Sequence, residues 1–203
     1  DLVCVTHGHS DHLGNAIEIV HETGATLVTL PEVAAYCSSY GIPYDDNGGC
    51  VHTGGSIVQK DVRIHAVFAL HSSDIMGKEY AENNQVMPGS GTCGMILTPE
   101  EGVPVYFAGD TGVFGDMALI GKLYRPRVAV LPIGGKYTMG VREAAYAMEL
   151  LGSQVLIPGH YNTFPSQMAD THELVKAVAV RCPHAHVVVL KPGQSWTFRT
   201  CRT

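Results

Sequence analysis

Three histidines and one aspartate lie within six consecutive positions near the start of the chain. Residues 6–12 read Thr-His-Gly-His-Ser-Asp-His, directly after a short apolar run at residues 2–5. Imidazole nitrogens and carboxylate oxygens offer lone pairs in fixed directions, which is what metal ions bind. A turn at the end of a buried strand can hold such side chains towards one point. The segment therefore predicts a metal site.

Three further candidate ligands share one placement, because each follows a predicted strand and lies in a polar or glycine-rich loop. His71 ends an alternating strand, Asp110 lies in Gly-Asp-Thr-Gly, and His160 lies in Pro-Gly-His-Tyr-Asn. In layered α/β folds the strand ends present such loops to a common crevice. Five histidines and two aspartates would then converge, enough for two metal ions with Asp110 between them.

The expected elements alternate along the chain. Strands are predicted at residues 2–5, 26–30, 62–70, 93–97, 103–108, 128–133, 155–157 and 186–190. Helices are predicted at residues 11–22, 31–40, 116–124, 141–151 and 169–181. Residues 72–92 are predicted to form a long polar loop, with or without a short ordered piece, of the kind that serves as a lid or a binding loop. The regular alternation after residue 125 favours an α/β architecture.

Composition limits the class of protein and its partners. A length of 203 residues suits one domain with a substantial core or two small ones, and a single domain over residues 1–203 is predicted. The net charge of −6 argues against nucleic acid, so a small-molecule substrate is expected. The apolar runs are too short to cross a bilayer. The six cysteines form no Cys-x-x-Cys pair, which predicts thiols in a reducing, cytoplasmic compartment. Assembly into a homo-oligomer stays open.

The His-x-His-x-Asp-His pattern of residues 7–12 resembles the signature of the metallo-β-lactamase superfamily. The later candidates follow in that superfamily's order. Residues 109–112, 131–135, 137–140 and 160–165 resemble one branch, the bacterial and archaeal metal-dependent hydrolases related to the ascorbate-6-phosphate lactonases. The resemblance covers nearly the whole chain. It implies an αββα sandwich, a fold of mixed α/β class.

The same resemblance implies a dinuclear centre. Its ligands would be His7, His9 and His71 for a first metal, and Asp11, His12 and His160 for a second, with Asp110 bridging. The histidine at position 9 favours the zinc-type hydrolases over di-iron redox relatives, which usually carry an acidic residue there. Two divalent ions are expected, zinc first, with manganese or iron as alternatives because a mixed His/Asp set suits all three.

The predicted activity is hydrolysis of an ester, lactone or phosphoester bond in a small molecule. A hydroxide between the two metals would attack, and Asp11 is the predicted catalytic residue that helps the proton leave. Two alternatives stay open. One is a metal-dependent nuclease or phosphodiesterase with the same metal core. The other is a catalytically silent relative that binds metal and keeps the fold.

Five residues that flank the ligand loops are candidates for substrate contact: Lys136, Tyr137, Thr138, Tyr161 and Asn162. For each of them a purely structural role in its loop is an equal alternative.

A further expectation concerns the start of the chain. Members of this branch carry several strands before the opening motif, so one sheet is expected to lack its N-terminal strands and to leave an uncovered edge.

Overall fold

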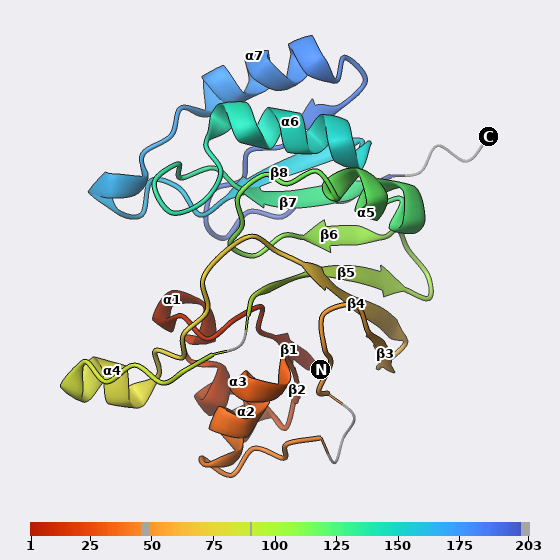
Figure 1. The fold of residues 1–203 in the computed structure, drawn as a ribbon. Helices are drawn as coiled ribbons and strands as arrows, with labels where there is room; N and C mark the ends of the chain where they lie inside the picture. Colours follow the sequence, from red (N-terminus) through yellow and green to blue (C-terminus); the bar gives the residue numbers. More distant parts are fainter. Residues whose placement is uncertain (46–48, 90, 200–203) are drawn as a thin grey trace.

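The computed structural model describes residues 1–45, 49–89 and 91–199, and it consists of two sheets enclosed by helices (Figure 1). A parallel pair joins β1 (Leu2–Cys4) to β2 (Thr26–Val28). The second sheet has seven strands in the order β3-β4-β5-β6-β7-β8-β9. Figure 1 shows α1, α2 and α3 beside the small sheet and α5, α6 and α7 beside the large one. The predicted mixed α/β class is confirmed.

The strands of the large sheet are β3 (Ser56–Gln59), β4 (Val62–Phe68), β5 (Cys93–Pro99), β6 (Val105–Phe107), β7 (Val128–Pro132), β8 (Val155–Gly159) and β9 (His186–Val187). From β3 to β6 the neighbours are antiparallel, whereas β6 to β9 are parallel. Strands β4, β6, β7 and β8 therefore run in one direction, and their carboxyl ends meet at one edge. The sequence did not predict β3.

The helices are α1 (Ser10–Leu13), α2 (Ala16–Thr23), α3 (Pro31–Ser38), α4 (Lys78–Asn83), α5 (Met117–Tyr124), α6 (Val141–Leu151) and α7 (Thr171–Arg181), with the 3-10 turn η1 (Pro165–Gln167). The single helix expected at residues 11–22 is wrong. Gly14 interrupts it with φ 44° and ψ −130°, a conformation that needs glycine. The break separates the short α1 from the packed α2. None of the helices in the described ranges has the length and apolarity that crossing a membrane requires.

Three apolar clusters hold the layers together. One packs α1, α2 and α3 on the small sheet, with Leu13 and Leu27 among its buried residues. The second lies between the sheets and contains Val28, Ile64 and Met95. The third fills the space between the large sheet and α5, α6 and α7. This order of layers is the predicted αββα sandwich.

Strand β4 corrects one expectation from the sequence. The alternation predicted that Phe68 and Leu70 share the buried face of Ile64, yet they are 51% and 52% exposed. Val67 and Ala69 are buried instead. The middle of β4 is covered on both faces, so simple alternation does not identify the inner side. Over the described residues the small sheet comprises β1 and β2.

Candidate metal centre

The predicted ligands gather from separate segments at one edge of the sheets. His7 and His9 follow β1, and Asp11 and His12 lie in α1. The other three follow strands of the large sheet: His71 after β4, Asp110 after β6 and His160 after β8. Because these three strands run in one direction, the loops that follow them reach the same edge. The topology thus brings all seven side chains together.

The first group consists of His7, His9 and His71, which offer ring nitrogens within 4.8 Å of one another. The His7 Nε2 and His9 Nδ1 atoms are 3.0 Å apart. The His71 ring centroid lies 5.3 Å from that of His7 and 5.1 Å from that of His9. Ring nitrogens that face each other this closely need a proton or a cation between them.

The second group consists of Asp11, His12 and His160, whose ligand atoms also lie within 4.8 Å of one another. The His160 Nε2 atom is 3.1 Å from Asp11 Oδ2. The rings of His12 and His160 stack with centroids 5.3 Å apart and planes 9° from parallel. His160 adopts φ 53°, which is uncommon for a residue with a side chain and marks a backbone held in place by its surroundings.

Asp110 lies between the two groups and is 4% exposed. Its Oδ1 atom is 3.2 Å from His12 Nε2 and 3.5 Å from His160 Nε2. Its Oδ2 atom is 3.6 Å from His71 Nε2. The carboxylate therefore presents one oxygen to each group.

Two buried atoms at this junction have no hydrogen-bond partner among the described residues: His12 Nε2 and Asp110 Oδ1. They lie 3.2 Å apart without forming a hydrogen bond to each other. Buried polar atoms without a partner are rare because they lose their water without compensation. A divalent cation would supply the missing partner, so the residues present fit a metal centre.

The protonation states suit metal binding. Burial, together with repulsion from His12 and His9, lowers the pKa of His7 to about 3. Burial also lowers the pKa of His9 and His71, so these imidazoles are neutral at pH 7 and keep a lone pair for a metal. Burial raises the pKa of Asp110, but His12 and His160 outweigh it and keep that pKa below its usual range.

The Asp11–His160 contact changes the pKa of both residues in the direction expected for an ion pair. The hydrogen bond from His160 is the largest effect on Asp11 and lowers its pKa below the usual range for a carboxyl. The same hydrogen bond raises the pKa of His160. Asp11 is therefore a carboxylate at neutral pH, and with 44% of its side chain exposed it faces the cavity above the ligands.

Two glycines allow the close approach of the segments that carry the ligands. A Cβ on Gly8 would lie 2.9 Å from the Cα of Ile75, and Gly8 O accepts a hydrogen bond from Met76 N at 2.8 Å. Gly109 has φ 61°, and a Cβ there would lie 2.9 Å from the Thr6 side chain. Thr6 Oγ1 in turn lies 3.1 Å from His7 Nδ1, which leaves the opposite nitrogen, Nε2, for the site.

A cavity of about 780 Å³ opens over the two groups. Its lining comprises His9, Ser10, Asp11, His71, Ser72, Met76, Tyr80, Asp110, Tyr137, His160, Phe164, Pro165, Ser166 and Gln167. Of the five predicted substrate contacts, Tyr137 lines this cavity. Four lining residues were not predicted from the sequence: Met76, Tyr80, Phe164 and Gln167. The length of the segment at residues 72–92 indicated a binding loop that contains the first two. No local sequence feature indicated that the other two line the cavity.

The other predicted contacts lie outside the lining of the cavity. Lys136 Nζ is 5.0 Å from the ring centroid of Tyr137, and the Thr138 hydroxyl donates to a neighbouring main-chain carbonyl at 3.4 Å. Tyr161 packs against the large apolar cluster. Asn162 is engaged through its amide, which accepts from Ala169 N at 2.8 Å and donates to Ala169 O at 3.3 Å. The Asn162 amide thereby supports the loop that follows β8.

Helix α4 forms part of one wall of the cavity over the metal groups, although none of its own residues is buried. The Glu79 carboxylate accepts hydrogen bonds from the hydroxyls of Tyr36 in α3 at 2.7 Å and of Tyr40, in the turn after α3, at 2.6 Å. Lys78 N donates to the Tyr36 hydroxyl at 2.9 Å, and Gly77 packs against the same ring with no room for a Cβ. We call Tyr36, Tyr40 and Glu79 the tyrosine clamp.

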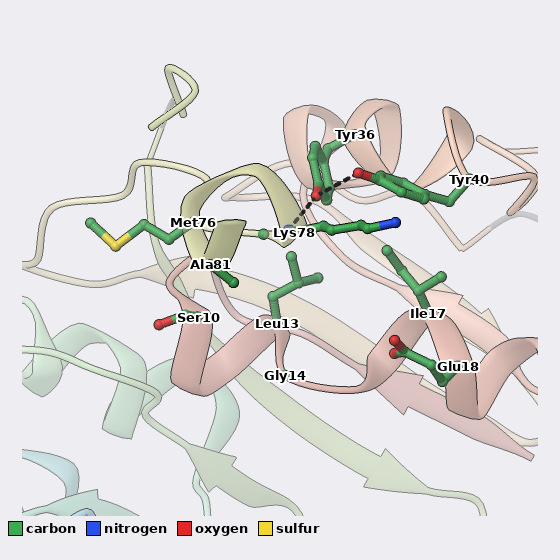
Figure 2. Close-up of a pocket in the computed structure, with 11 residues that line it drawn as sticks. Ser10, Leu13, Gly14, Ile17, Glu18, Tyr36, Tyr40, Met76, Lys78 and Ala81 are labelled. Atoms are coloured by element: carbon green, nitrogen blue, oxygen red, sulfur yellow. Dashed lines mark hydrogen bonds between the residues drawn. The ribbon is translucent and has the colours of Figure 1, made fainter. Parts of the chain in front are cut away.

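Figure 2 shows a second cavity of about 440 Å³ behind α4, with Tyr36 and Tyr40 on one side and α1 on the other. Ser10 and Met76 line both this cavity and the one over the metal groups. The segment around α4 therefore separates the two cavities. The tyrosine clamp connects this segment to α3.

Comparison with known proteins identifies the family. The model of the beta-lactamase superfamily domain matches residues 1–161, a range that includes all seven candidate ligands. The chain belongs to this superfamily. It is 45% identical over 196 residues to a UPF0173 metal-dependent hydrolase of Methanopyrus kandleri, covering 97% of this chain and 81% of that protein. A UPF0173 metal-dependent hydrolase of Koribacter versatilis is 39% identical, with 97% and 79% covered.

Among solved structures, the superfamily member is similar to Igni18, a metallo hydrolase from the hyperthermophilic archaeon Ignicoccus hospitalis. The TM-score is 0.81 and the identity 36%, over 98% of this chain and 80% of that one. The predicted metallo-β-lactamase fold is confirmed by this likeness and by the family match.

Proposed function

We propose that the protein is a hydrolase that depends on two divalent cations held side by side. The observation that carries this proposal is the orientation of Asp110. One carboxylate oxygen lies 3.2 Å from His12 of the second group, and the other lies 3.6 Å from His71 of the first. A carboxylate placed in this way could give one oxygen to each of two neighbouring cations, which would together activate water. The metal-dependent hydrolases among its relatives support the same activity.

The residues divide between the two cations by their grouping. His7, His9 and His71 would hold the first cation, Asp11, His12 and His160 the second, and Asp110 would contact both. Three neutral imidazoles suit zinc, so zinc is the first candidate. Manganese and iron also accept mixed imidazole and carboxylate ligands.

When bound, the divalent ions would lower the pKa of water and polarise the scissile bond. Asp11, which its low pKa keeps as a carboxylate, would accept a hydrogen bond from the attacking water and help its proton leave. The water oxygen forms the new bond, the bond to the leaving oxygen breaks, and that oxygen gains a proton. The substrate would be a small ester, lactone or phosphoester that fits the cavity.

Elemental analysis followed by a substrate screen tests this function. We expect two metal equivalents per chain and hydrolysis that disappears on chelation and returns when metal is restored. Asp11→Ala should abolish turnover. A chain that binds one equivalent would contradict the dinuclear assignment. Undiminished turnover by a metal-loaded Asp11→Ala variant would contradict the role of Asp11. A metal-loaded protein that cleaves RNA instead of small molecules would favour the nuclease alternative.

A further inference from the structure

Thr111 is a fully buried polar residue beside one of the candidate ligands. It follows Asp110 directly, and its exposed fraction is 0%. Its hydroxyl accepts a hydrogen bond from the main-chain N–H of Leu70 at 2.9 Å and donates one to the carbonyl of Gly112 at 2.7 Å. Leu70 directly precedes His71, another candidate ligand. The hydroxyl therefore connects the segment that carries Asp110 to the segment that carries His71.

Hydrogen bonds within the large sheet do not fix the distance between these two segments. His71 follows β4 and Asp110 follows β6, and β5 lies between those strands. Neighbouring strands are about 4.8 Å apart, so β4 and β6 are separated by roughly 10 Å. The His71 Nε2 and Asp110 Oδ2 atoms nevertheless lie 3.6 Å apart. The two segments converge beyond the ends of the strands, and the contacts made there determine how closely the two ligands approach.

Two hydrogen bonds join these segments, and both involve Leu70. One is the bond from Leu70 N to Thr111 Oγ1, and the other runs from Gly112 N to Leu70 O at 3.0 Å. Gly112 also packs against the Leu70 side chain, where a Cβ would lie 3.3 Å from Leu70 Cδ2. Because only the first bond uses a side chain, a substitution of Thr111 removes that bond and leaves the main-chain groups of the second in place.

The main chain of Thr111 holds a third segment, the loop after β7. Thr111 O accepts a hydrogen bond from Met139 N at 3.1 Å, and Met139 O accepts one from Gly135 N at 3.0 Å. These bonds anchor the loop that carries Tyr137, a residue in the lining of the cavity over the metal groups. They do not use the Thr111 hydroxyl, so the hydroxyl has its own role in the contact with Leu70.

We propose that Thr111 is a positioning residue that sets the separation of His71 and Asp110 for the first cation. Its hydroxyl holds one segment against the other, so that the His71 ring nitrogen and one Asp110 oxygen stay close enough to bind the same ion. Outer groups that orient metal ligands are typically worth about 10- to 100-fold in metal affinity or activity. This inference rests on the proposed dinuclear hydrolase and adds a residue that is not itself a ligand.

Three substitutions at one position separate the effect of the hydroxyl from that of packing. Thr111→Val removes the hydroxyl and keeps nearly the same shape, Thr111→Ala removes the hydroxyl and a methyl group, and Thr111→Ser keeps the hydroxyl. Zinc affinity is measured by competition with a chromophoric chelator. In Thr111→Val and Thr111→Ala we expect one of the two zinc equivalents to bind about ten-fold more weakly, the lower end of the usual range. In Thr111→Ser we expect both affinities to stay close to those of the wild-type protein.

Ser153→Ala is the control for the loss of a buried hydroxyl. Ser153 is 6% exposed, and its hydroxyl donates to Pro126 O at 2.8 Å, so this variant also loses a bond to the main chain. Ser153 precedes β8, at the opposite end of that strand from His160. We expect both zinc equivalents to bind Ser153→Ala as they bind the wild-type protein.

The outcomes separate the inference from the function on which it rests. Thermal unfolding of the metal-free protein shows which variants fold. Unchanged zinc affinities in a folded Thr111→Val or Thr111→Ala variant would overturn the positioning role and leave the proposed function standing. Equal weakening of both equivalents, or an equal loss in Thr111→Ser, would also overturn it, because the effect would then not come from the hydroxyl acting on one cation. If the wild-type protein binds fewer than two zinc equivalents, the dinuclear function is overturned, and this inference with it.

Discussion

The metal groups and the walls of the cavity are built in different ways. His7 is fully buried and Asp110 nearly so, and the segments that carry them are joined to strands of the two sheets. In the walls, Tyr137 and Phe164 are about half exposed, and α4 buries none of its own residues. The candidate metal ligands are thus anchored at the edges of the sheets, whereas the walls of the cavity come from peripheral segments held by a few hydrogen bonds.

The largest effect should come from the metal groups. Asp110→Asn keeps the shape of the side chain but removes the charge that joins the two groups. We expect a loss of about 1,000-fold in kcat/KM, the scale of losing a major contact to the transition state, together with reduced metal content. Asp116→Asn, an exposed position six residues along the same loop, is the control. Full activity in Asp110→Asn would contradict the proposal that Asp110 contacts both cations.

The next prediction concerns the backbone that positions Asp110. Gly109→Ala places a Cβ at φ 61° and 2.9 Å from Thr6, so we expect the free energy of unfolding to fall by about 1–3 kcal/mol. Gly115→Ala is the matched control, because a Cβ there meets nothing within 4 Å. Denaturant unfolding measures both. Equal stability of the two variants would mean that the Gly109 turn tolerates a side chain.

A pH dependence follows from the buried imidazole of His7. Its pKa is about 3 in the folded chain, against 6.5 for a free side chain, so between these values the unfolded chain binds a proton that the folded chain does not. The contribution of the neutral His7 side chain to the free energy of unfolding is therefore fully present above pH 6.5 and is lost as the pH falls towards 3. Denaturant unfolding of the chelated protein at pH 7 and pH 5 measures this difference in the free energy of unfolding. His7→Gln should make the free energy of unfolding less dependent on pH. The same pH dependence in this variant and in the wild-type protein would argue against the role of His7.

The smallest effect should come from the wall. Glu79→Gln weakens the tyrosine clamp, and we expect KM to rise about three- to ten-fold, the scale of one ordinary hydrogen bond, with kcat and metal content nearly unchanged. Glu82→Gln is the control, since Glu82 is exposed and its contact with Lys78 is a surface ion pair of 3.8 Å. A lower metal content in Glu79→Gln would show that the cavity wall and the metal groups do not act independently.

Much of the fold could be predicted from the sequence, and the reasons are local. The helix at Val141–Leu151 matches its prediction at both ends, because its apolar spacing and the following Gly152 lie within one short segment. The break at Gly14 and the buried side of β4 were not predictable in this way. They depend on what packs against those segments from elsewhere in the chain.

The same division applies to the site. Residue types and spacing alone identified the seven candidate ligands, because imidazoles and carboxylates that follow strands are a chemical pattern readable in one dimension. Only the tertiary structure decided that the two oxygens of Asp110 face different groups, that Asn162 supports a loop, and that Gln167 is among the residues that line the cavity. Side-chain direction is set by contacts between distant residues, such as His160 with Asp11, 149 positions apart. No local pattern in the sequence encodes such contacts.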